Sequence, residues 1–381
     1  MRYNTVKLGD YLYIKGRIGW KGLKKNEYLE KSNYRIINGE SLTDDGIDWD
    51  KAGYITQERY EESPEIMLQP NDILLSKDGT IGKIGFVEEL EYPTTVASGI
   101  FVIRNLQPEI INTRFIYNFL CSTYFKNFIT MRTEGSVIPH LYQKDFVDLD
   151  FPLPTMDEQN KIVKILDDIS NKIDLNKKIK INLKEQMISI YLNEINNISV
   201  ERPLEEILEF FDSKRKPLSS REREKMKKIY PYYGATDIVD YVEDFIFEGI
   251  YILISEDGAN VVDKKGRPLV QYTRDKFWLN NHAHIVKGKN GFSEGLIYTL
   301  LLTTNMQSIV TGAAQPKINQ ANLKSFQVNV PCYEHVITLS KIIEPMFAQL
   351  IECDRQNQDL LELKKSLLSR LMSGILNVSK L

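Results

Sequence analysis

The chain has 381 residues, of which 42% are hydrophobic and 27% charged, and its formal net charge at pH 7 is −3. This composition is typical of a globular protein with two or three domains. The slightly acidic balance excludes an overall basic protein, so any nucleic-acid binding has to come from local clusters of Lys and Arg. No segment approaches 18 uncharged apolar residues and the N-terminal segment 1–17 lacks an apolar signal core, so we expect a cytoplasmic protein. Three cysteines, Cys121, Cys332 and Cys353, are too few and too scattered for a disulfide framework or a zinc site.

The second half of the chain repeats the first in the same order. The matching segments are "ILLSKDG" (73–79) with "YILISEDG" (251–258), "RFIYNFL" (114–120) with "GLIYTLL" (295–301), and "GSVIPHLYQKDFVDLDFPLP" (135–154) with "GAAQPKINQANLKSFQVNVP" (312–331). The copies stay 177 to 181 positions apart throughout. Chance matches of short apolar words would not keep both order and spacing, so we interpret the chain as an internal duplication.

Each copy begins with a region of mixed α/β character. Short apolar or alternating runs such as "DILLSK", "ASGIFVIR", "GIYILIS" and "HAHIVK" predict strands, because Gly, Asp and Asn turn signals bound them. The spacing of Phe, Tyr and Leu predicts a helix over 113–131 in the first copy and over 293–310 in the second.

Each copy then continues into a long amphipathic helix. The first is expected over 154–195, with Thr155 as its N-cap and with Asp157 and Glu158 in its first turn. Its apolar residues follow a 3-4 spacing that Asn176 and Lys180 interrupt, and the stripe of the second helix is interrupted by Asn357 and Lys364. Neither helix can bury its stripe alone, so we predict that the two pair as an antiparallel coiled coil. The simpler alternative is that each apolar stripe packs only on its own domain as part of the core.

The stretch "LLSKDGTIGKIGF" (74–86) invites a phosphate-loop interpretation, which its spacing does not support. Gly82-Lys83 is followed by Ile84 rather than Ser or Thr, and Gly79 lies too close to Gly82. In the second copy Glu256 stands where Lys77 stands in the first, and an acid argues against an anion site. What both copies share is a strand followed by Asp-Gly, a turn signal. Lys77 and Lys83 flank this turn in the first copy and are candidates for contacts that only this half makes.

Basic and aromatic residues cluster near the start of each copy. Such clusters are usually solvated surface, but two at matching places favour nucleic-acid contact, with Lys and Arg on phosphates and Tyr near base edges. The candidates in the first copy are Lys15, Arg17, Trp20, Lys21, Lys24 and Lys25, and those in the second are Lys214, Arg215, Lys216, Arg221, Arg223, Tyr232 and Tyr233.

The sequence carries no recognisable catalytic or metal-binding set. It contains no HExxH, CxxC, G-x-S-x-G or cofactor loop, and no Asp/Asn-Pro-Pro-aromatic tetrapeptide of amino-group methyltransferases. His282 and His284 would share one face of a strand without an evident third ligand, so we interpret them as ordinary strand histidines. We therefore expect no metal, no cofactor and no catalytic residue.

Two segments resemble the specificity subunits of type I restriction–modification enzymes. "PHLYQKDFVDLDFPLPTMDEQNKIVKILDDISNKIDLNKKI" (139–179) is similar to the central conserved region of that family, and "PYYGATDIVDYVEDFIFEGIYILISEDGA" (231–259) to the opening of a target recognition domain. The second copy departs from the pattern, because Glu334-His335-Val336 replaces Asp157-Glu158-Gln159 and Pro345 falls in the early turns of the helix. That departure raises the possibility of altered partner docking or of a later helix start.

The resemblance implies an α+β chain of two tandem target recognition domains, 1–154 and 199–331, each followed by a spacer helix, 155–198 and 332–381. Such a subunit has no catalytic activity of its own. Each domain reads one half of a split double-stranded DNA target, and the helices set the gap and dock two methyltransferase subunits. A separate ATP-driven subunit translocates and cuts. The alternative of another class is a two-domain protein-interaction scaffold whose basic clusters are only solvated.

Overall fold

A computed structural model describes residues 3–18, 22–133, 140–146, 149–197, 199–312, 314–376 and 378, without the side chains of residues 25 and 133. The chain divides into two compact units. The first unit is Met1–Lys172 with Asp359–Leu381, and the second unit is Ile173–Gln358. Each unit therefore contains one globular region and a segment from each of two long helices. Within the described residues, no helix is both long and apolar enough to cross a membrane.

A four-stranded sheet with the same order occurs in both units. In the first unit the order is β2-β10-β7-β8, and in the second it is β13-β20-β17-β18. The strands are β2 (Leu12–Gly16), β7 (Ile73–Ser76), β8 (Ile84–Phe86), β10 (Ile100–Asn105), β13 (Leu208–Phe210), β17 (Ile252–Ser255), β18 (Val270–Tyr272) and β20 (Ala283–Gly288). The registers also agree, since Ser76 pairs with Ile100 and Ser255 with Ala283. The expected strands in "DILLSK", "ASGIFVIR", "GIYILIS" and "HAHIVK" are confirmed.

A second sheet in each unit mixes parallel and antiparallel neighbours. The first unit has β6-β3-β9, and the second has β15-β14-β19-β16. The central strands β3 and β14 each pair with one antiparallel and one parallel neighbour. The bounds are β3 (Tyr34–Ile37), β6 (Gly53–Ile55), β9 (Thr94–Val96), β14 (Tyr230–Tyr233), β15 (Ile238–Val242), β16 (Phe247–Glu248) and β19 (Lys276–Leu279). The duplication inferred from sequence is therefore also a duplication of topology.

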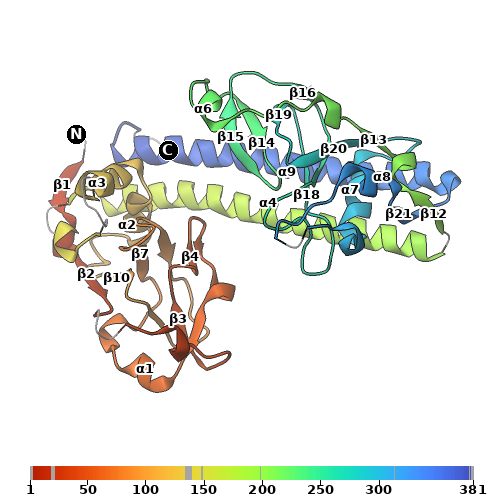
Figure 1. The fold of residues 1–381 in the computed structure, drawn as a ribbon. Helices are drawn as coiled ribbons and strands as arrows, with labels where there is room; N and C mark the ends of the chain where they lie inside the picture. The colour runs from red at the N-terminus through yellow and green to blue at the C-terminus, as the bar shows by residue number, and fades with distance from the viewer. Residues whose placement is uncertain are drawn as a thin grey trace. The chain divides into compact units, whose positions relative to one another are not determined.

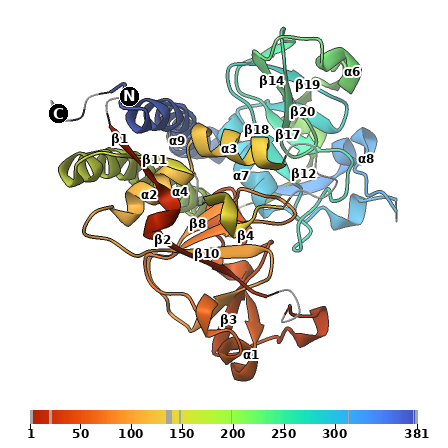
Figure 2. The same cartoon turned by 90° about the vertical axis from the view of Figure 1, so that its left-hand side faces the viewer.

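Short two-stranded pairings lead from each domain to its long helix. β1 (Asn4–Lys7) pairs with β11 (Asp150–Leu153), and β12 (Ser199–Pro203) pairs with β21 (Gln327–Pro331). Figure 2 shows β1 and β11 next to α2 in the first unit. The remaining short elements are β4 (Leu42–Thr43), β5 (Gly46–Ile47), α1 (Gln57–Glu61), α5 (Leu204–Ile207), α6 (Ser220–Arg223) and α8 (Gln320–Ser325).

The helix expected over 113–131 is two helices, so that prediction is wrong in its extent. α2 (Thr113–Leu120) ends at Cys121, and α3 (Thr123–Thr133) begins after Ser122, whose hydroxyl accepts a bond from the Phe125 amide at 3.3 Å. A serine N-cap of this kind starts a new helix. In the second unit α7 (Glu294–Thr303) is followed only by a 3-10 turn at Gln307–Ile309, so the helix expected over 293–310 is also shorter.

The two long helices are α4 (Met156–Asn197) and α9 (Tyr333–Met372). Within each unit a segment of α4 runs antiparallel to a segment of α9 (Figure 1). Thr155 caps α4 as predicted, because its hydroxyl accepts from the Glu158 amide at 3.4 Å and Glu158 accepts from the Thr155 amide at 3.1 Å. α9 begins no later than its counterpart despite the altered motif, and Pro345 lies inside it.

The polar residues that interrupt the stripe of one long helix find polar partners on the other long helix. In the second unit the buried Asn176 donates from Nδ2 to Oδ1 of Asn357 at 2.9 Å, and Lys180 pairs with Asp354. In the first unit Lys364 donates to the Ser170 hydroxyl at 2.6 Å. A buried amide pair of this type favours one register of a coiled coil, at some cost in stability.

The Gln of the Pro152–Gln159 motif is a structural clamp. Gln159 is fully buried; its Oε1 accepts from the Asn112 amide at 2.8 Å, and its Nε2 donates to the carbonyls of Ile110 and Pro154. Asn112 is the N-cap of α2, so the clamp fixes α2 to the start of α4. In the second unit Val336 takes this position, and Ser340, one turn later, accepts from the amide of the α7 N-cap at 3.2 Å.

Replacing Gln159 by Leu is expected to lower the free energy of unfolding by about 2 kcal/mol, because one backbone amide and two backbone carbonyls lose the buried side chain that bonds them. Urea denaturation measures the change. The matched control is Lys164→Leu at an exposed position of the same helix, where we expect a much smaller loss. Equal losses in the two variants would contradict the clamp.

Candidate nucleic-acid interface

Both units place an Asp-Gly turn at the same end of the four-stranded sheet. β7 leads into Asp78-Gly79 and β17 into Asp257-Gly258, and both glycines have positive φ, +66° and +148°. The Ser76 hydroxyl closes the first turn by donating to the Thr80 carbonyl at 2.6 Å and accepting from the Lys83 amide at 2.8 Å. The predicted turn is therefore confirmed in both copies, and we call these two regions the sheet ends.

The charges beside the two turns are exchanged between the units. Asp78 forms a β-bridge with His140, and Asp257 forms the matching bridge with Lys317. Lys77 lies with Nζ 5.0 Å from the centre of the Phe101 ring. Its counterpart Glu256 pairs with Arg215 at 2.7 Å and with Lys317 at 3.2 Å. Two cations therefore balance the charge of Glu256 at this turn.

A buried polar network supports the sheet end of the second unit. The fully buried His284 contacts Asp212 from Nδ1 at 2.7 Å and the Ile318 carbonyl from Nε2 at 2.8 Å. Burial raises the pKa of Asp212, but hydrogen bonds from His284 and the Ile285 amide, together with the charge of Arg215, bring that pKa below its usual range. His284 is thus a core residue, while His282 is about half exposed.

Arg17 belongs to the core of the first unit and not to its surface. Its side chain is fully buried, and Nε donates to the Val96 carbonyl at 3.0 Å while Nη2 lies 3.3 Å from the Thr95 hydroxyl. Burial, reinforced by the nearby charge of Arg59, lowers the pKa of Arg17. Because the Arg17 guanidinium is buried and bonded to Val96 and Thr95, it cannot contact a DNA phosphate in this conformation.

The other candidates of the first unit are more accessible or fall outside the description. Lys24 is exposed, and Lys15, Lys77 and Lys83 are partly exposed. Trp20, Lys21 and the side chain of Lys25 lie outside the described residues.

In the second unit the aromatic and most of the arginine candidates also serve the fold. Tyr232 and Tyr233 are buried, and the Tyr232 hydroxyl accepts from the Leu218 amide at 2.9 Å. Burial raises the pKa of Tyr233 to about 12. Arg223 pairs with Asp240 at 2.6 Å, and Arg215 pairs with Glu256. Lys214, Lys216 and Arg221 remain exposed and can neutralise phosphates.

Three further side chains at the sheet ends were missed from sequence. They are His140, His282 and Lys317, which expose 29%, 48% and 46% of their side chains. In the alignment of the two copies, His140 corresponds to Lys317, and two basic side chains at one position could have indicated these two residues. Nothing in the sequence indicated His282, because its contact with Asp257 is visible only in the structure.

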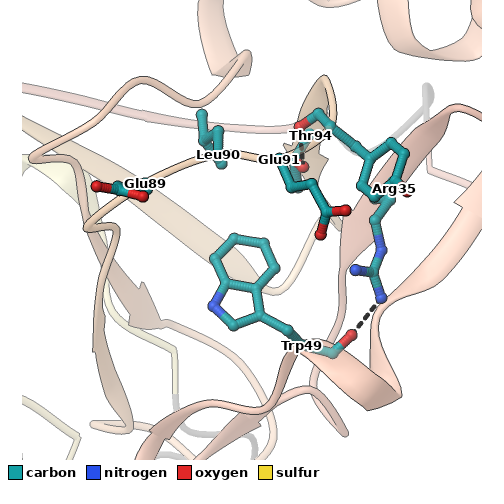
Figure 3. A pocket seen from close by; sticks show the side chains of 7 residues that line it. Arg35, Trp49, Glu89, Leu90, Glu91 and Thr94 are labelled. Carbon is teal, nitrogen blue, oxygen red and sulfur yellow. Dashed lines mark hydrogen bonds between the residues drawn. The ribbon is translucent and has the colours of Figure 1, made fainter.

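A cavity of about 440 Å³ in the first unit lies beside Trp49 and does not suit DNA. Figure 3 shows the Glu91 carboxylate between the Trp49 indole and the Arg35 side chain, which donates to the Trp49 carbonyl. Glu89 also lines the cavity. Two exposed carboxylates at its edge would repel a phosphate backbone, so we leave this cavity out of the interface.

Comparison with known proteins places this geometry in one family. A family model described as the type I restriction modification DNA specificity domain matches residues 2–185 and 199–363. A putative type I restriction enzyme specificity subunit of Haemophilus influenzae is 32% identical over 147 residues, which are 39% of this chain and 37% of that protein. The MjaVIII specificity subunit of Methanocaldococcus jannaschii is 32% identical over 191 residues, 47% of this chain and 39% of that protein.

These two alignments therefore span less than two fifths of either relative. The MjaIX specificity subunit of the same organism aligns more completely, at 20% identity over 86% of this chain and 82% of that protein. The crystal structure of a type I restriction–modification S subunit from M. genitalium has a TM-score of 0.56 at 18% identity, covers 98% of this chain and 96% of that chain, and so shares the fold. Because the family model covers both sheet ends and most of both long helices, the chain belongs to the family of type I restriction–modification DNA specificity proteins.

Proposed function

We propose that the chain is the non-catalytic DNA-specificity subunit of a type I restriction–modification complex and acts in the cytoplasm. Its two target recognition domains, 1–154 and 199–331, each bind one half of a split double-stranded DNA target. The spacer helices, 155–198 and 332–381, set the gap between the halves and dock two methyltransferase subunits. An ATP-dependent restriction subunit completes the complex, and this chain itself needs no cofactor.

The observation that carries this proposal is the pair of matching sheet ends. A protein that reads two half-sites needs the same reading surface twice, with different side chains on each copy. The two sheet ends share the strand order and the Asp-Gly turn, while Lys77 and His140 in one correspond to Glu256 and Lys317 in the other. Base readout depends on such side chains, and the strand scaffold beneath them carries no sequence information.

Lys214→Ala and Lys216→Ala are expected to weaken DNA binding by the complex with methyltransferase subunits and to reduce its dependence on salt. Each lost phosphate contact lowers the slope of log affinity against log salt by about 0.9. Filter binding or anisotropy across a salt series measures the slope. The matched control is Lys289→Ala, because Lys289 is exposed just beyond the opposite end of β20.

The protein-interaction scaffold predicts a different result in the same experiment. It predicts no duplex binding, or binding whose affinity does not respond to salt. Equal slopes for Lys216→Ala and Lys289→Ala would remove the second sheet end from the interface.

A further inference from the structure

Each turn aspartate holds an exposed histidine. His140 contacts Asp78 through Nδ1, and His282 contacts Asp257 through Nδ1 at 2.5 Å. Both histidine side chains are partly exposed, at 29% and 48%. The same pair of groups therefore stands at the same place in both units.

The two histidines come from different positions of the repeat. His140 corresponds to Lys317, because each forms the β-bridge to its turn aspartate. His282 directly precedes β20, so its counterpart directly precedes β10 and is Gly99. A Cβ placed on Gly99 would lie 3.7 Å from the Asp78 Cβ, so this position also faces the turn. Duplication of a single ancestral histidine does not account for both pairs, because the two histidines occupy different positions of the repeat. We infer that each unit needs a histidine beside its turn aspartate.

The orientation of the rings leaves one nitrogen available. Nδ1 is bonded to a carboxylate in both cases, and Nε2 has no hydrogen-bond partner in the part of the chain that is described. When the ring is protonated, Nε2–H is a donor whose charge the aspartate balances. When the ring is neutral with its proton on Nδ1, Nε2 becomes an acceptor and repels other acceptors.

The charged neighbours of each pair can be named from the elements that pack against it. The centre of the His140 ring lies 4.4 Å from the centre of the Tyr142 ring. The Lys144 ammonium lies 5.4 Å from the centre of the same tyrosine ring. Lys77 is the residue before Asp78 in the chain.

Around His282, the Glu256 amide donates to the His282 carbonyl, and Arg215 contacts the neighbouring Asn281 carbonyl. Lys317 pairs with Glu256. Cations thus accompany both pairs, and a cationic donor beside lysines suits an acceptor on an anionic partner.

We propose that His140 and His282 each donate a hydrogen bond from Nε2 to an acceptor of the DNA half-site bound by their unit. The acceptor is a phosphate oxygen or the N7/O6 edge of a guanine. Asp78 and Asp257 act as positioning residues, because each holds its histidine ring through Nδ1. This inference rests on the proposed function.

Loss of either histidine is expected to weaken DNA binding, because the acceptor on the half-site is left without its hydrogen-bond partner. A hydrogen bond that involves a charged group corresponds to about tenfold in affinity. His140→Leu and His282→Leu should each weaken binding by about that factor.

The experiment uses the complex with methyltransferase subunits and the duplex target mapped by methylation sequencing. Anisotropy gives the affinity, and thermal melting checks that each variant is folded. The matched control is His335→Leu, because His335 pairs with Glu194 between the long helices and not at a sheet end. Its affinity for the target should match that of the original protein.

Modified DNA distinguishes the two acceptors. Methylphosphonate at single positions removes a phosphate charge, and 7-deazaguanine removes N7; the substitution that abolishes the difference in affinity between the original protein and the histidine variants identifies the acceptor. If the complex binds its target but His140→Leu and His282→Leu keep the original affinity, the histidine contact is wrong while the proposed function stands. If the complex binds no duplex, the proposed function itself fails.

Discussion

Replacing Arg215 by Ala is expected to lower the free energy of unfolding of the second unit by about 3 kcal/mol, because it removes one of the two cations that balance the mostly buried Glu256, together with several guanidinium hydrogen bonds. Arg215 donates to Glu256 at 2.7 Å and to the Ala283 carbonyl at 2.7 Å, and its Nε donates to the Asp212 carbonyl at 3.1 Å. Only 14% of its side chain and 12% of that of Glu256 are exposed. Arg215→Lys should recover little, because an ammonium cannot replace several fixed guanidinium contacts.

Urea denaturation followed by tryptophan fluorescence measures this change, in chains whose Trp20 and Trp49 are replaced by Phe so that only Trp278 of the second unit reports. The adjacent Lys216→Ala is the matched control, since Lys216 is exposed and should affect DNA binding and not folding. We therefore predict that Arg215→Ala lowers stability, whereas Lys216→Ala lowers DNA affinity and leaves stability unchanged. If Arg215→Ala folds as stably as the original chain and only its DNA affinity falls, the network is not structural.

The sequence predicted most correctly what is encoded locally. The strands before both Asp-Gly turns and the N-cap at Thr155 follow from periodicity and capping within short segments. The antiparallel pairing of α4 with α9 is long-range, and it was predictable because each helix carries an apolar stripe along its length. The duplication was visible because the matching segments kept their order. Even the break between α2 and α3 had a local cause in Ser122, which the apolar spacing of the segment concealed.

The site could not be predicted as well, because burial and pairing depend on residues far apart in the chain. Arg17 bonds to Val96, 79 positions away, and Arg215 to Glu256, 41 positions away. A count of basic residues cannot separate such structural arginines from exposed lysines. The same reason hid His140, which meets Asp78 across 62 positions.

Deleting one heptad from both long helices, residues 170–176 and 357–363, is expected to shorten the preferred gap between half-sites by about three base pairs. Seven residues of α-helix rise about 10 Å, and one base pair of duplex rises about 3.4 Å. Removing a whole heptad keeps the apolar stripes nearly in phase, because two helical turns take about seven residues.

These residues are the suitable ones to remove because they lie between the segments of each helix that belong to the two hydrophobic core clusters. The deletion does remove the buried Ile173 and the Ser170 partner of Lys364. On α4 the core of the first unit includes Leu166, and the core of the second unit resumes at Leu183. On α9 the corresponding limits are Leu367 and Ile351. Asn176 and Asn357 are removed together, so neither amide is left without its partner.

A set of targets whose gap varies one base pair at a time measures the result. Three base pairs also turn a duplex by about 100°, given 10–10.5 base pairs per turn, so affinity for the best gap is expected to fall as well. The matched controls are an insertion of the same heptads, which should lengthen the gap by the same amount, and a deletion from α4 alone. The single deletion shifts the two stripes out of register and should destabilise the chain. If the double deletion folds, binds both half-sites and prefers the original gap, the helices do not set the spacing, and the distance must be fixed by the partner subunits.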